Sequence, residues 1–144
     1  MSLRIEPVNR FNWEHCARLS LFDEQLKFIP SNLYTIAQSK YENLELYALY
    51  LDHIPIGMAA IGYFAKVYWI SRIMIDKNYQ KLGYGTSFLK LLLAKITNDR
   101  KSYEIRTAIH PENLHAQRLF KKEGFELLGQ MEDGELIFHK WIHH

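Results

Sequence analysis

The segment Gln80–Thr86 reads QKLGYGT and decides the fold, because it joins a predicted strand to a strongly apolar predicted helix. The glycines at Gly83 and Gly85 permit positive φ and let a bulky ligand approach the backbone closely. The first N–H groups of the following helix lack intrahelical acceptors and lie at the positive end of its dipole. A phosphate group is the natural ligand there, and Lys81 and Thr86 add a cation and a hydroxyl. The alternative is a tight turn that binds nothing.

The spacing of the glycines excludes two common phosphate-binding motifs. A P-loop needs a lysine directly after its last glycine, and Gly85 is followed by threonine. The dinucleotide fingerprint needs a third glycine, which this segment lacks. The sequence therefore predicts a phosphate-binding turn of a different kind.

Outward from this turn, the hydrophobic pattern predicts alternating strands and helices. We expect strands over 3–8, 44–51, 54–64, 67–76, 103–109, 125–131 and 136–141, and helices after Asn12, after Ser31, over 86–98 and over 113–123. The crossover from residue 67 to residue 109 should join parallel strands, and the other neighbours should pair antiparallel. The period of two places residues 67, 69, 71, 73 and 75 on one face. We expect one α+β domain, 1–144, with a mixed, twisted sheet of about seven strands flanked by four helices.

The composition is that of a globular protein. Hydrophobic residues make up 48% and charged residues 24%, and the formal net charge of +2 is too small to indicate nucleic-acid binding. Cys16 is the one cysteine, so we expect no internal disulfide and a reducing compartment, the cytoplasm. The longest uncharged apolar run, 54–65, is shorter than the roughly 20 residues that a membrane span needs. Neither nucleic acid nor a membrane is therefore expected as a partner.

Two blocks of the sequence, Asp76–Gly85 (DKNYQKLGYG) and Asn113–Phe125 (NLHAQRLFKKEGF), stand out. Together they resemble motifs of the GCN5-related N-acetyltransferase (GNAT) family. The first is similar to its acyl-CoA pyrophosphate loop, Gln/Arg-x-x-Gly-x-Gly/Ala, and the second to its pattern Asn-x-x-Ala-x-x-Leu-Tyr-x-x-x-Gly-Phe. The blocks follow one another in the predicted order of elements, and the resemblance covers nearly the whole chain. It implies that strands 67–76 and 103–109 splay apart and open a slot for a thioester.

The resemblance implies acetyl-CoA as cosubstrate. Strand 67–76 would pair with the pantetheine amides, the backbone N–H groups of the glycine turn would hold the pyrophosphate, and the helix of the second block would accommodate the cofactor arm. The residues implied in cofactor binding are Ile73, Met74, Ile75, Lys81, Leu82, Gly83, Tyr84, Gly85, Thr86, Asn113 and Ala116.

A closer resemblance within the family is to bacterial spermine/spermidine acetyltransferases, carried by residues 25–29, 69–76 and 79–80. It implies acetylation of a primary amine on a small molecule, with a polyamine as the leading acceptor. The alternatives are another amine (an aminoglycoside, an amino acid or a protein N-terminus) or a non-catalytic acyl-CoA-binding module. Asp23 and Glu24 could attract a polycation or form a solvated helix face. Glu42 and Glu45 are interpreted as surface residues.

The usual catalytic side chains of the family are replaced here. Phe120 stands where many relatives have a tyrosine acid, and Ser71 stands where several polyamine-type relatives have an acidic residue. Ser71 could orient a water molecule. His110 is a candidate base, because imidazole is the side chain suited to proton exchange near neutral pH, or simply a turn histidine, and Glu24 is a second candidate base. A third possibility is that water protonates the leaving thiolate and positioning supplies the rate.

Two further interpretations concern metals and assembly. His110 and His115, with Glu112 between them, have a spacing that suits no known zinc site, so no metal is expected. The C-terminal hairpin, 125–141, should leave an exposed strand edge, which is compatible with a homodimer.

Overall fold

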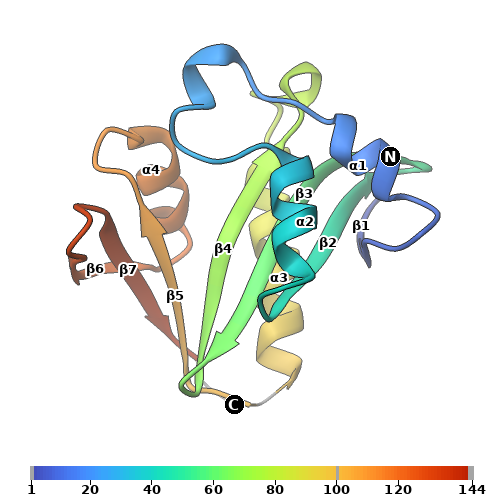
Figure 1. Ribbon diagram of the computed structural model, residues 1–144. Coiled ribbons are helices and arrows are strands. Elements are labelled where there is room, and N and C mark those ends of the chain that lie inside the picture. The colour runs from blue at the N-terminus through green and yellow to red at the C-terminus, as the bar shows by residue number, and fades with distance from the viewer. Residues whose placement is uncertain (1, 100, 143–144) are drawn as a thin grey trace.

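The computed structural model describes residues 2–99 and 101–142 and contains a seven-stranded sheet with helices on both faces (Figure 1). The elements are β1 (Leu3–Pro7), α1 (Trp13–Arg18), the 3₁₀ turn η1 (Asp23–Gln25), α2 (Asn32–Ser39), β2 (Leu44–Leu51), β3 (Ile54–Phe64), β4 (Val67–Ile75), the 3₁₀ turn η2 (Lys77–Tyr79), α3 (Tyr84–Asp99), β5 (Glu104–Ile109), α4 (Leu114–Lys122), β6 (Glu126–Gln130) and β7 (Leu136–Trp141). The predicted α+β class and the predicted order of strands and helices are confirmed.

The sheet has the strand order β1-β2-β3-β4-β5-β7-β6. Every neighbouring pair is antiparallel except β4 and β5, which are parallel. These two strands pair only at Tyr68–Ile105 and Trp69–Arg106, and then diverge as a V in Figure 1. The predicted splay of the two strands is therefore confirmed.

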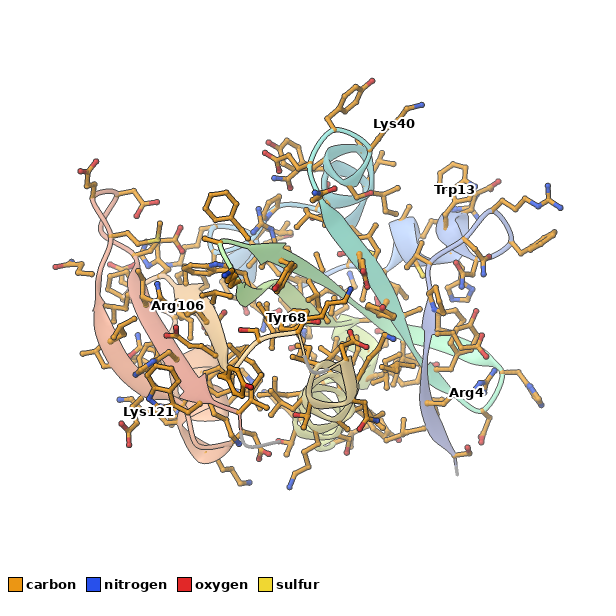
Figure 2. All side chains as sticks on the ribbon, turned by 90° about the horizontal axis from the view of Figure 1, so that it is seen from below. Arg4, Trp13, Lys40, Tyr68, Arg106 and Lys121 are labelled. Carbon is orange, nitrogen blue, oxygen red and sulfur yellow. The ribbon has the colours of Figure 1, made fainter. Side chains whose placement is uncertain are left out.

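Each face of the sheet has its own core. The larger core joins α3 and α4 to the sheet and includes Phe88, Leu92 and Phe120. The smaller core joins α1 to the opposite face through Cys16 and Met74, with α2 packed against it. Figure 2, seen from below, shows Tyr68 near the middle of the molecule, between Arg4 on the β1 side and Arg106 on the β5 side.

A β-bulge at Ser71 reverses the two faces of β4. Ile70 and Arg72 oppose consecutive residues of β3, so Ser71 has no partner there. A bulge of this kind interrupts the alternation of side chains. Ile70 before the bulge and Ile75 after it both enter the core under α3, and Trp69 lies on the other face. The prediction that residues 67, 69, 71, 73 and 75 share one face is therefore wrong.

Candidate active site

A cleft of about 510 Å³ opens where β4 and β5 diverge. Its walls are the second half of β4, the β4–α3 loop, the end of β5, the start of α4 and part of the segment between α1 and α2. Of the residues predicted to bind the cofactor, those that line this cleft are Ile73, Met74, Ile75, Lys81, Tyr84, Gly85, Asn113 and Ala116. Leu82, Gly83 and Thr86 belong to the same loop and helix start but do not line it.

The backbone of β4 is open toward the gap over a short stretch. The carbonyl of Met74 faces β3, because a Cβ built on Gly57 of that strand would lie 2.6 Å from it. Alternation then turns the backbone groups of Ile73 and Ile75 toward the gap. The carbonyl of Ile75 accepts from Gln80 Nε2 (2.9 Å). The amide groups of Ile73 are thus placed to pair with an extended ligand, as an added strand would.

The β4–α3 loop turns sharply into the helix. φ is positive at Lys81 (64°) and Gly83 (86°), and of the two motif glycines Gly83 is the one in the left-handed region. Ser87 N–H donates to Gly83 O (3.2 Å). The N–H groups of residues 84–86 precede this bond and have no helical carbonyl to bind. They form a donor cluster at the positive end of a 16-residue helix.

Asn113 caps the helix on the other bank of the cleft. Its Oδ1 accepts from Ala116 N–H (3.2 Å) at the start of α4. Both residues line the cleft. The family resemblance implies that Asn113 reaches the cofactor arm, which stays a prediction, and in the structure its side-chain carbonyl caps the helix.

The segment between α1 and α2, residues 19–31, crosses the mouth of the cleft. In Figure 1 it extends over the gap between β4 and β5 toward α4. On one bank, the amide of Gln25 is hydrogen-bonded to that of Gln80 (3.0 Å). On the other bank, the ring of Phe28 lies 5.2 Å from that of His110, centroid to centroid. The cleft is therefore covered by a segment attached to both sides.

A second cleft, of about 640 Å³, lies between the start of β2, the end of β3, residues 69–72 of β4 and the turn between β6 and β7. Its charged lining residues include three carboxylates, Glu42, Asp133 and Glu135, and its aromatic lining residues are Tyr63, Phe64 and Trp69. Glu42, interpreted from the sequence as a surface residue, lines this cleft. The two clefts share the residues Ile70, Ser71, Arg72 and Ala108, so they meet at the bulge of β4.

Residues 10–125 match the Acetyltransferase (GNAT) family. The chain belongs to this family. A protein of Bacillus subtilis subsp. natto (strain BEST195) named probable spermine N(1)-acetyltransferase is 29% identical over 150 residues, which cover 97% of this chain and 99% of its own. The aminoglycoside N(6')-acetyltransferase type 1 of Klebsiella pneumoniae is 29% identical over 138 residues, 85% of this chain and 65% of its own.

The fold of this GNAT acetyltransferase is also found in solved structures. The structure of aminoglycoside acetyltransferase AAC(6')-Ib in complex with coenzyme A and kanamycin has a TM-score of 0.78 and 20% sequence identity. The match covers 97% of this chain and 95% of that one. The fold is thus the same, and the match of residues 10–125 to the family confirms the resemblance drawn from the glycine turn and the second block.

The GNAT acetyltransferase holds His110 in one tautomer. His110 lines the cofactor-side cleft, and its Nδ1 accepts from Glu112 N–H (3.0 Å). The neutral ring therefore carries its proton on Nε2, which makes Nε2 a donor. This arrangement weighs against His110 as a general base, because its one lone pair is already engaged.

The other residues considered for catalysis are placed differently. Ser71 lines both clefts. Glu24 is exposed on η1 and lines neither cleft. Phe120 is 2% exposed and packs edge-to-face on Phe125 at 5.0 Å, so it fills the wall of the cofactor-side cleft. The structure thus brings Ser71 and His110 to the cleft and leaves Glu24 outside it.

Arg72 was missed by the sequence analysis. It lines both clefts, and its guanidinium donates to Ser71 O (2.7 Å). Its Nε is buried and has no hydrogen-bond partner among the described residues. The available signal was a single cation within an otherwise uncharged strand, β4.

Within residues 2–99 and 101–142, no three histidine, cysteine or acidic side chains are grouped so as to hold a metal ion. The described part of the chain also contains no helix whose length and apolar character would let it cross a membrane.

Proposed function

We propose that this GNAT acetyltransferase transfers the acetyl group of acetyl-CoA to a primary amine of a small polycation, with the polyamines spermine and spermidine as the leading acceptors. The observation that carries the proposal is the meeting of two differently lined clefts at the bulge of β4. One cleft offers backbone donors and Lys81, and the other offers three carboxylates.

In the first cleft, the pyrophosphate of acetyl-CoA would bind the N–H groups of residues 84–86, aided by Lys81 and the helix dipole. The pantetheine amides would pair with the backbone of Ile73 in the gap between β4 and β5. This route brings the thioester to the bulge, where the second cleft begins.

In the second cleft, Glu42, Asp133 and Glu135 supply negative charge for ammonium groups. The aromatic rings there add apolar surface for methylene chains and cation–π attraction. A polyamine combines several cations with methylene chains, which is the chemistry that this lining complements. The names of the Bacillus and Klebsiella relatives, a spermine and an aminoglycoside acetyltransferase, support a polycationic acceptor.

Acetyl transfer needs the amine in its neutral form. Glu24 lies outside both clefts, and the lone pair of His110 is engaged, so we propose that water accepts the amine proton with Ser71 orienting it. Positioning of the amine against the thioester then supplies much of the rate.

The test is release of the coenzyme A thiol with a panel of amines: spermine, spermidine, putrescine, kanamycin, lysine and a peptide with a free N-terminus. We expect the highest kcat/KM with spermine or spermidine. A higher value with lysine or the peptide would contradict the polycation assignment, and kanamycin as the best acceptor would make the aminoglycoside the acceptor. Calorimetry with coenzyme A tests cofactor binding separately.

Three further predictions from the sequence belong to this proposal. We propose that residues 1–144 act as one acetyltransferase domain, because strands from both ends of the chain, β1 and β7, belong to one sheet. We propose the cytoplasm as the place of action, in keeping with a single cysteine. We propose a homodimer through the exposed edge strand β6, to be tested by light scattering.

A further inference from the structure

Arg72 lies at the passage between the two clefts. It belongs to the four residues that line both of them. The bulge at Ser71 reverses the alternation of β4 and so decides which face Arg72 occupies. An amine that reaches from the second cleft to a thioester in the first crosses the boundary that Arg72 shares with Ile70, Ser71 and Ala108.

The guanidinium of Arg72 is incompletely satisfied. It donates to Ser71 O, and its Nε is buried without a partner among the described residues. Arg106 on the adjacent strand is the contrast, because its Nε and one terminal nitrogen donate to the two oxygens of Glu104 at 2.8 and 3.1 Å. A buried donor left without an acceptor costs free energy, which calls for a physical explanation.

We infer that Arg72 is a catalytic residue whose guanidinium, at the boundary of the two clefts, stabilises the oxyanion of the tetrahedral intermediate. The inference rests on the placement of acetyl-CoA and amine under the proposed function. An arginine already held in place by the backbone carbonyl of Ser71 pays little reorganisation when the charge develops. Nε itself is shielded from solvent, so the part of the guanidinium that lines the clefts makes the contact with the oxyanion.

The chemistry balances with the groups named. The neutral amine nitrogen forms a bond to the thioester carbonyl carbon, and the carbonyl electron pair moves to oxygen, where Arg72 donates to it. The nitrogen loses its proton to water. Collapse of the intermediate restores the carbonyl and breaks the carbon–sulfur bond, and the thiolate takes a proton from water to give coenzyme A and the N-acetylated amine.

The test uses Arg72→Ala and Arg72→Lys, with Arg18→Gln as control because the Arg18 side chain is 80% exposed on α1. In Arg72→Ala we expect kcat to fall by about 10²-fold, the typical effect of removing one oxyanion donor. KM for acetyl-CoA and the Kd for coenzyme A should stay within about twofold, because a group that acts on the intermediate contributes little to ground-state binding. Guanidinium chloride, well below unfolding concentrations, should restore part of kcat in Arg72→Ala.

A structural role would not give this rescue. Wild-type kcat in both variants, or a fall in kcat that guanidinium does not restore, would overturn the inference. If Arg72→Ala fails to fold, Arg72→Lys tests the inference instead. Lysine keeps the charge but lacks the planar guanidinium, so kcat should fall, and an unchanged kcat would contradict the inference. Failure of the proposed function would be seen in the wild-type enzyme, as a different best acceptor. The Arg72 variants would then be compared with the wild type on that acceptor.

Discussion

The side-chain amides of Gln25 and Gln80 donate to each other, each at 3.0 Å, across 55 residues of sequence. Gln80 also donates to Ile75 O, and Gln25 Oε1 accepts from Phe22 N–H. This pair joins the segment between α1 and α2 to the loop that we assign to the pyrophosphate. The covering segment and the cofactor loop are therefore one hydrogen-bonded unit.

Replacing Gln25 with leucine should weaken cofactor binding. The change leaves the amide of Gln80 without its partner and loosens the loop, so KM for acetyl-CoA should rise about tenfold, or ~1.4 kcal/mol, with kcat little changed. A double-mutant cycle with Gln80→Leu checks the assignment. The double variant should lose little more than either single one, and additive losses would show that the two amides act independently.

Replacing Glu135 with glutamine should weaken binding of the acceptor amine without affecting binding of acetyl-CoA. The change removes one carboxylate from the second cleft, and KM for spermine should rise about tenfold while KM for acetyl-CoA stays constant. Glu132→Gln is the matched control, since Glu132 is exposed in the same hairpin and lines neither cleft. Equal effects of the two variants would mean that only overall charge matters.

Replacing Gly57 with alanine should destabilise the fold. A Cβ there would lie 2.6 Å from Met74 O and 3.3 Å from the ring of Phe88, so β3 must move away from β4. Overpacking of this kind costs about 1–3 kcal/mol of unfolding free energy, measured by urea denaturation. The control is Gly129→Ala, where a Cβ meets nothing within 4 Å. A Gly57→Ala protein as stable as the control would refute the close approach.

Glu104 should make stability depend on acid pH. Hydrogen bonds from Arg106, and next from His139, hold the pKa of Glu104 below its ordinary value despite burial. A carboxyl with a lowered folded pKa stabilises the protein above its unfolded pKa and loses that contribution as pH falls through the folded pKa. Glu104→Gln should therefore be less stable than wild type at pH 7, and the difference should vanish at strongly acid pH in thermal melts. A difference that is constant with pH would exclude the ion pair as its cause.

Cys16 should be unreactive in the folded enzyme. Burial raises the pKa of its thiol to about 11, and the side chain is fully buried between α1 and the sheet. Thiol reagents at pH 8 should therefore label the native protein slowly and the denatured protein at once. Rapid labelling of the native protein would show that α1 opens readily. Slow labelling also means that the coenzyme A release assay has no background from the enzyme.

The fold followed from local signals in the sequence. The turn at Gly83 and the apolar helix after it are encoded in consecutive residues, and the second block from Asn113 places α4 in the same way. These signals gave the family, the parallel pair and the gap between β4 and β5. The helix start differs by two residues, because α3 begins at Tyr84 instead of Thr86.

The features that the sequence did not predict depend on contacts between distant segments. The bulge at Ser71 is a property of the pairing of β4 with β3, and regular alternation along β4 gives no sign of it. The second cleft brings together Glu42 and Glu135, which are 93 residues apart in the sequence. The Gln25–Gln80 pair likewise joins two polar residues that look unremarkable apart. Geometry of this kind emerges only when the whole sheet is assembled.

The backbone pairing of β4 with β5 is limited to Tyr68–Ile105 and Trp69–Arg106, and beyond it the hydroxyl of Thr107 donates to Ile70 O (2.9 Å). The sheet therefore has two parts, β1–β4 and β5–β7, joined along a short seam. A small rotation about that seam changes the width of the slot above it. A ligand whose amide groups contact both parts of the sheet would restrict this rotation. Ligand binding should therefore slow amide hydrogen exchange along the seam, far from the pyrophosphate loop.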